Sequence, residues 1–329
     1  MTRLGFVQAD PIRAPARAQD LTLRHRVKGY RAGDLEARYE ELPVEEDHFL
    51  NYGFLPRELV DLMHPRAARP WDRTSRARAT KVLAFVREAG EAHPRDVDAR
   101  FAHGTVTNYW GGTSSATTHL LEAMHFRGML EVVRREAGIR VYAPRESVAL
   151  ELDPRARAER LLDVAIGKYA PLPAASLRQL ASRLRHAAPQ LAGELRAAAV
   201  RALASYPHVS LAGVDWYWLP GEDPARAPDD DDDRVRLLAP FDPVVWDRRR
   251  FELFWGWAYR FEAYTPAPKR KLGYYALPLL FRDQVIGWAN VSADAVTTGF
   301  TSGKAPRDRA FARGLEAEIA ALRAFLRPR

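Results

Sequence analysis

The chain has 329 residues, of which 47% are hydrophobic and 28% are charged, and it carries a formal net charge of +8 at pH 7. This length predicts two or three domains, and the composition is that of a globular chain rather than a disordered one. The chain contains no cysteine, which excludes a disulfide framework, a cysteine-ligated zinc or iron–sulfur site and a thiol nucleophile.

The charge balance points to the class of partner. A pI near 9.8 favours a polyanion, nucleic acid before a membrane surface. No segment approaches about 18 uncharged apolar residues, and the first residues lack the apolar stretch of a signal peptide, so we expect a cytoplasmic protein without a membrane span. His119 and His125 share a predicted helix but stand on different faces, and the other histidines do not cluster, so we expect no metal site.

Residues 1–72 predict a first domain. They open with an extended stretch that Pro11 and Pro15 interrupt. A helix is expected over residues 16–28, and an aromatic-rich segment over residues 48–63 is expected to be partly buried.

Residues 73–150 predict a second domain. Its first helix begins at a cap, Thr74 or Ser75, and a later helix begins at Ser115 and ends at Gly128. Two short strands with glycine in the turn between them then predict a hairpin. Helices followed by a short basic hairpin give the outline of a winged helix.

Residues 151–222 repeat this outline and predict a third domain, with three helices before a hairpin that turns at Ala212-Gly213. Residues 223–234 include five consecutive aspartates and predict an acidic linker or exposed loop. A run of like charges resists burial, which favours a solvated connection over a metal site or a DNA mimic.

Residues 235–329 predict the last domain. Aromatic and β-branched residues alternate with polar ones over residues 235–292, which predicts a small barrel-like β domain. A final helix over residues 307–326 is expected to pack onto it. The segment at residues 299–305 resembles a phosphate-binding loop, but its spacing is one residue short, so we expect a plain loop. The fold class predicted is α+β.

The most specific local pattern is Gln8-Ala9-Asp10-Pro11. Proline holds the preceding residue in an extended conformation, and residues two apart in an extended segment face the same side. Gln8 and Asp10 are therefore expected to face one pocket, where a carboxylate and an amide can hold water and stabilise a cationic sugar. The alternative is that Asp10 caps the helix that follows.

Several long motifs stand out, namely LGFVQADPIRAPARAQDL near the start, GVDWY at residues 213–217, LLAPFDPVVWDRRR, and YTPAPKRKLGYYALP. They resemble those of the YcaQ/AlkZ family of bacterial winged-helix DNA glycosylases. The resemblance covers nearly the whole chain. It implies tandem winged helices around a basic, concave DNA-binding surface, with a small C-terminal β-barrel-like domain and a terminal helix.

The resemblance also implies the roles of two residues. Asp10 occupies the position of the catalytic carboxylate, and Gln8 that of the amide that orients water or positions the nucleotide. No lysine stands near the motif in the sequence, so we expect a monofunctional enzyme. We also expect neither a cofactor nor a metal. The expected partner is double-stranded DNA that carries alkylated bases. We expect the protein to be a monomer that is associated with the nucleoid.

Binding to the duplex is expected to depend on arginine and lysine contacts with phosphates. For any single arginine the alternative is a solvated surface charge. The candidates are Arg13, Arg17 and Arg24 around the first helix, Arg134, Arg135 and Arg140 in the hairpin of the second domain, and Lys269, Arg270 and Lys271 in a basic turn framed by Tyr264, Tyr274 and Tyr275.

The resemblance thus implies hydrolysis of the N-glycosidic bond of cationic N7-alkylated purines, with bulky adducts and interstrand crosslinks among the candidate substrates. The alternative is a non-catalytic winged-helix DNA-binding protein or regulator. Two departures from the family pattern stand out. The motif begins close to the first residue, so either the start of the chain is misassigned or the first winged helix is incomplete. Asp47-His48-Phe49-Leu50-Asn51 replaces a different family stretch, which predicts a different substrate range.

Overall fold

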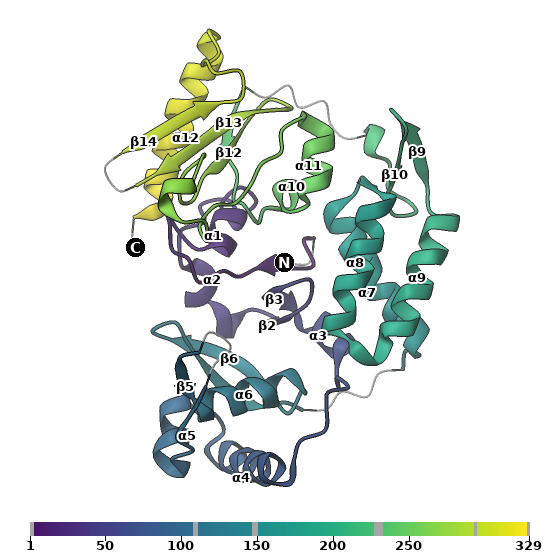
Figure 1. Ribbon diagram of the computed structural model, residues 1–329, viewed down its shortest axis with the longest axis vertical. Coiled ribbons are helices and arrows are strands. Elements are labelled where there is room, and N and C mark those ends of the chain that lie inside the picture. Colours follow the sequence, from purple (N-terminus) through teal and green to yellow (C-terminus); the bar gives the residue numbers. More distant parts are fainter. Residues whose placement is uncertain (1–2, 108–110, 147–150, 227–232, 293–294, 328–329) are drawn as a thin grey trace. The chain divides into compact units, whose positions relative to one another are not determined.

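The computed structural model describes residues 3–107, 111–146, 151–226, 233–292 and 295–327 (Figure 1). Residues 227–232, half of the predicted acidic linker, therefore lie outside the described residues. The chain divides into two compact units. Unit 1 comprises Met1–Phe6, Glu36–Val164 and Leu180–Arg201, and unit 2 comprises Val7–Leu35, Ala165–Gln179 and Ala202–Arg329.

Unit 1 is built mainly from its long central segment. Its elements are the 3-10 helix η1 (Tyr39–Glu41), strands β2 (Val44–His48) and β3 (Tyr52–Pro56), helices α3 (Arg57–Met63), α4 (Arg73–Ala89), α5 (Pro94–Phe101) and α6 (Ala116–Phe126), strands β4 (Thr105–Thr107), β5 (Thr113–Ser115), β6 (Leu130–Glu136) and β7 (Ile139–Pro144), and the 3-10 helix η2 (Pro189–Leu191). Strand β2 pairs with β3, β4 with β5 and β6 with β7, and each pair is antiparallel.

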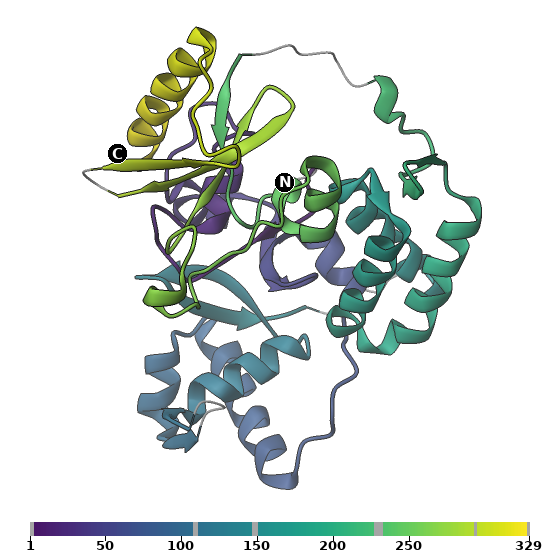
Figure 2. The ribbon, with the colours of Figure 1, turned by 45° about the horizontal axis from the view of Figure 1, so that its top comes forward.

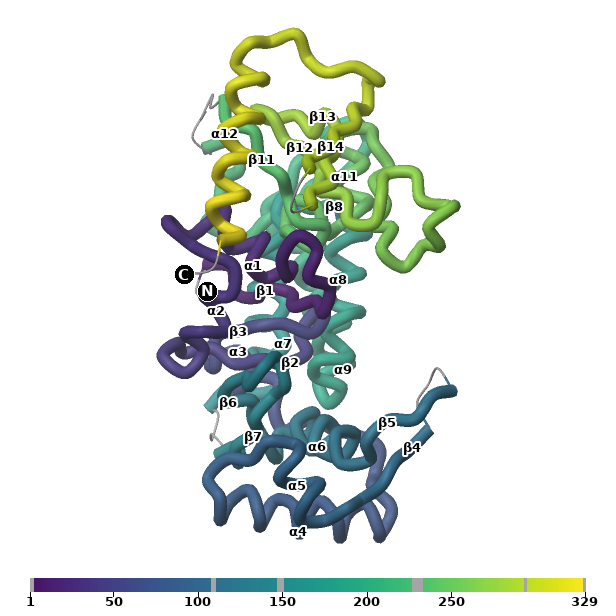
Figure 3. The backbone as a smooth tube through the Cα atoms, turned by 90° about the vertical axis from the view of Figure 1, so that its left-hand side faces the viewer, coloured from purple at the N-terminus to yellow at the C-terminus, as the bar shows by residue number. Residues whose placement is uncertain are grey.

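Helix α6 packs with α4 and α5, and α4 and α6 pack with the hairpin β6–β7 (Figure 3). Asp72 caps α4 by accepting a hydrogen bond from the Ser75 amide, so Ser75 is a donor to the cap and the predicted cap at Thr74 or Ser75 was wrong. The cap predicted at Ser115 is confirmed, since its hydroxyl accepts from the amide of Thr118 at the start of α6.

The sequence reading missed helix α5. It begins at a capping box in which His93 accepts from the backbone while the Asp96 carboxylate accepts from the His93 amide. The hairpin predicted after α6 is confirmed, and Ala137 and Gly138 both take positive φ in its turn, at 49° and 85°. Successive positive φ values give a turn whose twist matches that of antiparallel strands.

A row of buried charges fixes β2 within unit 1. Glu45, Glu46 and Asp47 are consecutive, and each is at most 1% exposed. A buried carboxylate without a partner is costly, and each of these has an arginine. The pairs are Glu45 with Arg145, Glu46 with Arg135, and Asp47 with Arg66. Burial raises the pKa of Asp47, but Arg66 and the neighbouring histidines lower it by more, so the net shift of the pKa is downward.

The predicted third domain supplies three helices and a hairpin. The helices are α7 (Pro154–Tyr169), α8 (Ala174–Ala187) and α9 (Ala192–Ser205), and each has residues in both units. The short helix α2 (Asp34–Ala37), earlier in the chain, also has residues in both units. Unit 2 holds strands β8 (Leu172–Pro173), β9 (His208–Leu211) and β10 (Val214–Tyr217), in the antiparallel order β8-β10-β9. The turn predicted at Ala212-Gly213 is confirmed, with φ values of 51° and 73°.

The C-terminal part of unit 2 is a four-stranded antiparallel sheet, not a barrel (Figures 1 and 2). Its strands are β11 (Val235–Leu237), β12 (Leu277–Phe281), β13 (Gln284–Val291) and β14 (Val296–Phe300), in the order of the chain. Within the described residues β11 and β14 are the edge strands and do not pair, so the sheet stays open and the barrel-like prediction was wrong. Strand β14 also includes the first residues of the predicted loop at 299–305.

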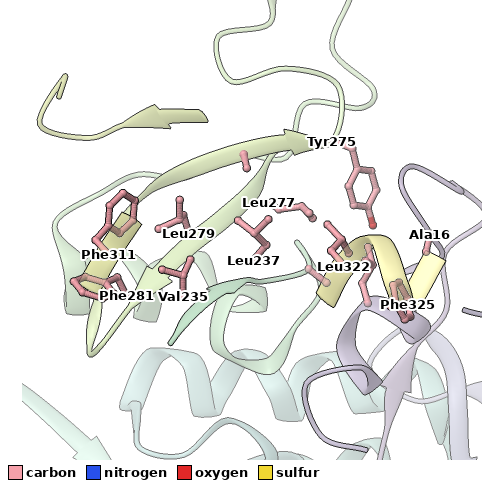
Figure 4. Packing of buried hydrophobic residues seen from close by; sticks show 13 residues of the cluster. Ala16, Val235, Leu237, Tyr275, Leu277, Leu279, Phe281, Phe311, Leu322 and Phe325 are labelled. Carbon is pink, nitrogen blue, oxygen red and sulfur yellow. The ribbon is translucent and has the colours of Figure 1, made fainter. Parts of the chain in front are cut away.

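Helix α12 (Arg309–Leu326) confirms the predicted terminal helix. Its Phe311, Leu322 and Phe325 enter a buried cluster with the apolar side chains of β11 and β12 (Figure 4). Ala16 and Tyr275 belong to the same cluster. The cluster therefore joins the N-terminal segment of unit 2 to its sheet.

Two short helices stand within residues 235–292, which the sequence predicted to be rich in strands. Helix α10 (Pro243–Trp246) is capped by Asp242, and α11 (Arg248–Trp255) is capped by Asp247. The aspartates accept backbone hydrogen bonds that an alternating pattern does not reveal. The remaining short elements are β1 (Val7–Gln8), α1 (Ala18–Leu23), η3 (Pro224–Arg226) and η4 (Ala267–Lys269), so the helix predicted over residues 16–28 is shorter than expected.

Candidate active site

Gln8 ends strand β1 and is 6% exposed, so its amide is held in a fixed surrounding. The Trp246 indole nitrogen donates a hydrogen bond of 3.0 Å to Oε1 of Gln8. The same indole stacks on the Tyr169 ring, with ring centroids 4.8 Å apart. With Oε1 engaged, the amide nitrogen of Gln8 remains a donor for a ligand or a water.

Asp10 does not cap the helix ahead. Its Oδ1 accepts a hydrogen bond of 2.8 Å from the Ile12 amide, while the N-cap residue of α1 is Arg17 and makes no side-chain cap bond. No residue in the described ranges donates a hydrogen bond to Oδ2. Burial raises the pKa of Asp10, and the Ile12 amide opposes that shift. One oxygen thus holds the carboxyl in place and the other can act on a ligand.

Two tyrosines, Tyr264 and Tyr275, interact with the charge of Asp10. Burial, and next the charge of Asp10, raises the pKa of Tyr264 and of Tyr275. The ring of Phe261 meets both edge-on, at centroid distances of 6.1 Å to Tyr264 and 5.1 Å to Tyr275. The Tyr275 hydroxyl is buried and finds no hydrogen-bond partner in the described part of the chain. Tyr264 and Tyr274 are 75% and 43% exposed.

Residues 262–274 form a loop that we call the tyrosine loop. Glu262 fixes it from inside: Oε2 accepts from the amides of residues 271, 272 and 273, at 2.8, 2.7 and 3.3 Å. Burial raises the pKa of Glu262, but these three donors outweigh burial and lower it overall. Gly273 has a φ of 116°, and the side chain of Asn290 packs against it and donates to the Leu272 carbonyl.

The tyrosine loop carries the predicted basic turn. Lys269 and Lys271 are exposed, whereas Arg270 is half-buried. The Arg270 guanidinium donates to the Thr265 carbonyl at 2.7 Å and lies 5.0 Å from the centre of the Tyr274 ring. The turn is therefore rigid at its arginine and free to meet anions at its two lysines.

The other predicted DNA contacts fall into two groups. Arg13 is exposed and Arg17 half-buried. The second group has carboxylate partners: Arg24 pairs with Glu318, Arg134 with Glu91 at 2.6 Å, Arg135 with Glu46 at 2.6 Å, and Arg140 with Glu122 at 3.1 Å. Arg24 and Arg135 are the most enclosed, with side chains 5% and 14% exposed.

Sequence reasoning missed Trp246, Tyr169 and Glu262, because each acts through a fold that brings distant segments together. It also missed Lys168, whose ammonium lies 5.5 Å from the centre of the Tyr169 ring. Burial lowers the pKa of Lys168 to about 7. The described ranges hold no group of three acidic or histidine side chains arranged to bind a metal, and none of their helices meets the length and apolarity needed to cross a bilayer.

Two comparisons with known proteins bear on the fold and on the family of this chain. A solved structure of Streptomyces sahachiroi DNA glycosylase AlkZ is similar to this chain, with a TM-score of 0.62 and 14% sequence identity over 98% of this chain and 89% of that one. At this identity the likeness shows a shared fold. The family model described as DNA glycosylase AlkZ-like matches residues 1–325. The chain therefore belongs to the AlkZ-like DNA glycosylase family.

Proposed function

We propose that the protein is a monofunctional DNA glycosylase that hydrolyses the N-glycosidic bond of cationic N7-alkylated purines in double-stranded DNA, bulky adducts and interstrand crosslinks included. One observation carries the proposal. Asp10 is half-buried, one of its oxygens is held by the Ile12 amide, and the other has no hydrogen-bond donor in the described residues. Such a carboxylate is placed to meet a charge that develops on a bound ligand.

The chemistry follows from these groups. Cleavage of the bond between C1′ and the base develops positive charge on the sugar, and the Asp10 carboxylate stabilises that charge. The carboxylate then takes a proton from the water that attacks C1′. Gln8 orients this water or the nucleotide with its amide nitrogen, because Trp246 holds the amide oxygen. An N7-alkylated purine leaves as a neutral base and needs little help from a general acid.

DNA binding in this proposal depends on exposed and half-buried basic side chains near the site. Lys269, Arg270 and Lys271 stand on a loop that Glu262 fixes, and Arg13 is exposed shortly after Asp10. The order of elements in unit 1, with α4, α5 and α6 before the hairpin β6–β7, supports a winged helix there. The helices α7, α8 and α9 before the hairpin β9–β10 repeat that order.

The test is release of 7-methylguanine from a duplex that contains one 7-methyldeoxyguanosine. Wild-type protein is expected to leave an abasic site, and Asp10→Asn is expected to bind the duplex without releasing the base. A wild-type protein that binds DNA and releases nothing would instead support the second candidate, a non-catalytic DNA-binding protein, which the basic turn alone would serve.

Borohydride trapping tests the monofunctional part of the proposal. Lys168 contacts Tyr169, which stacks on Trp246, and its lowered pKa suits an amine nucleophile. A monofunctional enzyme forms no covalent adduct with DNA under borohydride. An adduct that Lys168→Arg abolishes would make the enzyme a lyase as well.

A further inference from the structure

The most exposed large apolar side chain in the described residues stands beside the proposed catalytic carboxylate. Tyr264 is 75% exposed, more than any other such side chain. A large aromatic ring in water gives up the free energy that burial would supply. Tyr264 contacts Phe261 edge-on, and Phe261 packs against the same buried cluster as Ile12, the residue whose amide holds Asp10. The charge of Asp10 accordingly adds to the rise in the pKa of the Tyr264 phenol.

The backbone around Tyr264 is held in place. Glu262 accepts three amide hydrogen bonds from the far end of the tyrosine loop, and the Thr265 carbonyl accepts from Arg270. The Leu272 carbonyl is tied to Asn290 of β13. A ring that is exposed yet carried on a fixed backbone loses little conformational freedom when a ligand covers it.

The two exposed tyrosines of the loop differ in what occupies their rings. The Arg270 guanidinium already lies over Tyr274, 5.0 Å from its centre. Among the described residues no cation lies over Tyr264, whose recorded ring contact is with Phe261. Tyr264 therefore offers an unused π face, and Asp10 beside it supplies a negative charge. A π face next to a carboxylate attracts a flat cation and attracts a neutral purine much more weakly.

We propose that Tyr264 is a specificity-determining residue that recognises the positive charge of an N7-alkylated purine through its ring, and that Glu262 is the positioning residue that holds the ring beside Asp10. This proposal rests on the proposed function and names the residue that separates a cationic base from a neutral one. Tyr274 has a different role in it, which is to hold Arg270 toward the DNA backbone.

The test measures binding with duplexes that cannot be cleaved. One carries 2′-fluoro-7-methyldeoxyguanosine, which is cationic, and the matched duplex carries 2′-fluorodeoxyguanosine, which is neutral. Fluorescence anisotropy gives both dissociation constants for the full chain. Wild-type protein is expected to prefer the cationic duplex by about five- to thirty-fold, the range of a partly to fully desolvated cation–π contact.

Tyr264→Leu is expected to lower that ratio several-fold, because only the attraction of the Asp10 charge remains, while Tyr264→Phe keeps most of it because the ring remains. Tyr274→Leu is the matched control: it should weaken both duplexes by the same factor and leave the ratio unchanged. Glu262→Ala should lower the ratio, with thermal unfolding confirming that the protein is folded. A wild-type ratio of one, or a ratio that Tyr264→Leu leaves intact, overturns the proposal.

Excision assays on the ordinary 7-methyldeoxyguanosine duplex separate this inference from the proposed function. Release of 7-methylguanine with a binding ratio of one means that the glycosylase proposal stands and charge recognition by Tyr264 fails. A ratio that depends on Tyr264 in a protein that releases no base means that recognition stands and the glycosylase proposal fails.

Discussion

The Trp246 indole and the Gln8 amide, 238 positions apart in the chain, share a hydrogen bond of 3.0 Å. The indole also stacks on Tyr169, so its direction is fixed from two sides. The bond in turn sets which end of the Gln8 amide faces a ligand. This contact is the reason to treat Trp246 as a positioning residue for the proposed reaction.

Trp246→Phe is expected to keep the stacked ring and lose the hydrogen bond. The loss of one such bond is worth about 0.5–1.5 kcal/mol, which predicts a drop of about two- to twelve-fold in the single-turnover rate at unchanged DNA affinity. Gln8→Ala should lower the rate at least as much. If Trp246→Phe lowers the rate of the Gln8→Ala protein by its full factor again, Trp246 does not act through Gln8.

Asp10→Asn is expected to lower the single-turnover rate by about 10²- to 10³-fold, the scale of losing one preorganised electrostatic group. The carboxyl must be ionised to act, and burial raises its pKa above the ordinary value of 3.8. The wild-type rate should therefore fall as the pH drops toward this raised pKa. The residual rate of Asp10→Asn should lack that acid limb, and the same limb in both proteins would assign it to another group.

Arg135 is expected to stabilise the fold of unit 1 rather than to bind DNA. It pairs with Glu46, which is 0% exposed, so Arg135→Ala strands a buried carboxylate and should cost about 3–5 kcal/mol in the free energy of unfolding. Arg134→Ala is the matched control, because its partner Glu91 is 44% exposed and the pair is worth less than about 1 kcal/mol. Urea unfolding measures both. An Arg135→Ala protein of wild-type stability that binds DNA poorly would make Arg135 a phosphate contact.

His125 is expected to make the stability of unit 1 depend on pH. Burial lowers its pKa to about 4 from the ordinary 6.5, and its Nε2 has no hydrogen-bond partner in the described residues. The unfolded chain takes up a proton first, so stability should fall as the pH drops from 6.5 toward 4. His125→Gln should flatten this decline, by about 3 kcal/mol at most. His119→Gln, at an exposed position of the same helix, should leave the decline as it is.

Glu262→Ala is expected to loosen the tyrosine loop without unfolding the sheet. The three amides that lose their acceptor lie next to Lys269, Arg270 and Lys271, which are sites for trypsin. Cleavage there should accelerate, because proteolysis follows the population of locally open chain. Glu262→Gln, whose amide oxygen can still accept, should be cut at close to the wild-type rate. Equal cutting of all three proteins would mean that Glu262 does not hold the loop.

The sequence predicted best those elements that depend on local chemistry. The turn at Ala137-Gly138 was readable because a positive φ favours glycine, and α12 was readable from its regular apolar spacing. Helix α5 was missed because its sequence offers a single buried apolar residue, Val97, and its start depends on the His93 side chain. The segment around Pro243 alternates like a strand, but Asp242 and the proline make it start a helix.

In the proposed site, too, local sequence revealed some residues and tertiary structure was needed to reveal the others. Gln8 and Asp10 could be found because proline after Asp10 forces an extended backbone. Their partners could not, since Trp246 and the tyrosine loop reach them through tertiary structure. The sequence also does not tell an arginine that faces solvent from one like Arg24, whose partner Glu318 stands on the last helix.

The three acidic side chains at residues 45–47 have a consequence for how this sequence can diverge. Each of them pairs with an arginine elsewhere in unit 1, so replacing one residue of a pair alone leaves the other as a buried charge without a partner. Tolerated replacements should therefore arrive in twos, with position 46 changing alongside 135, and 45 alongside 145. The acidic sequence of β2 is typical of an exposed strand, yet β2 should be among the slowest parts of the molecule to change in sequence.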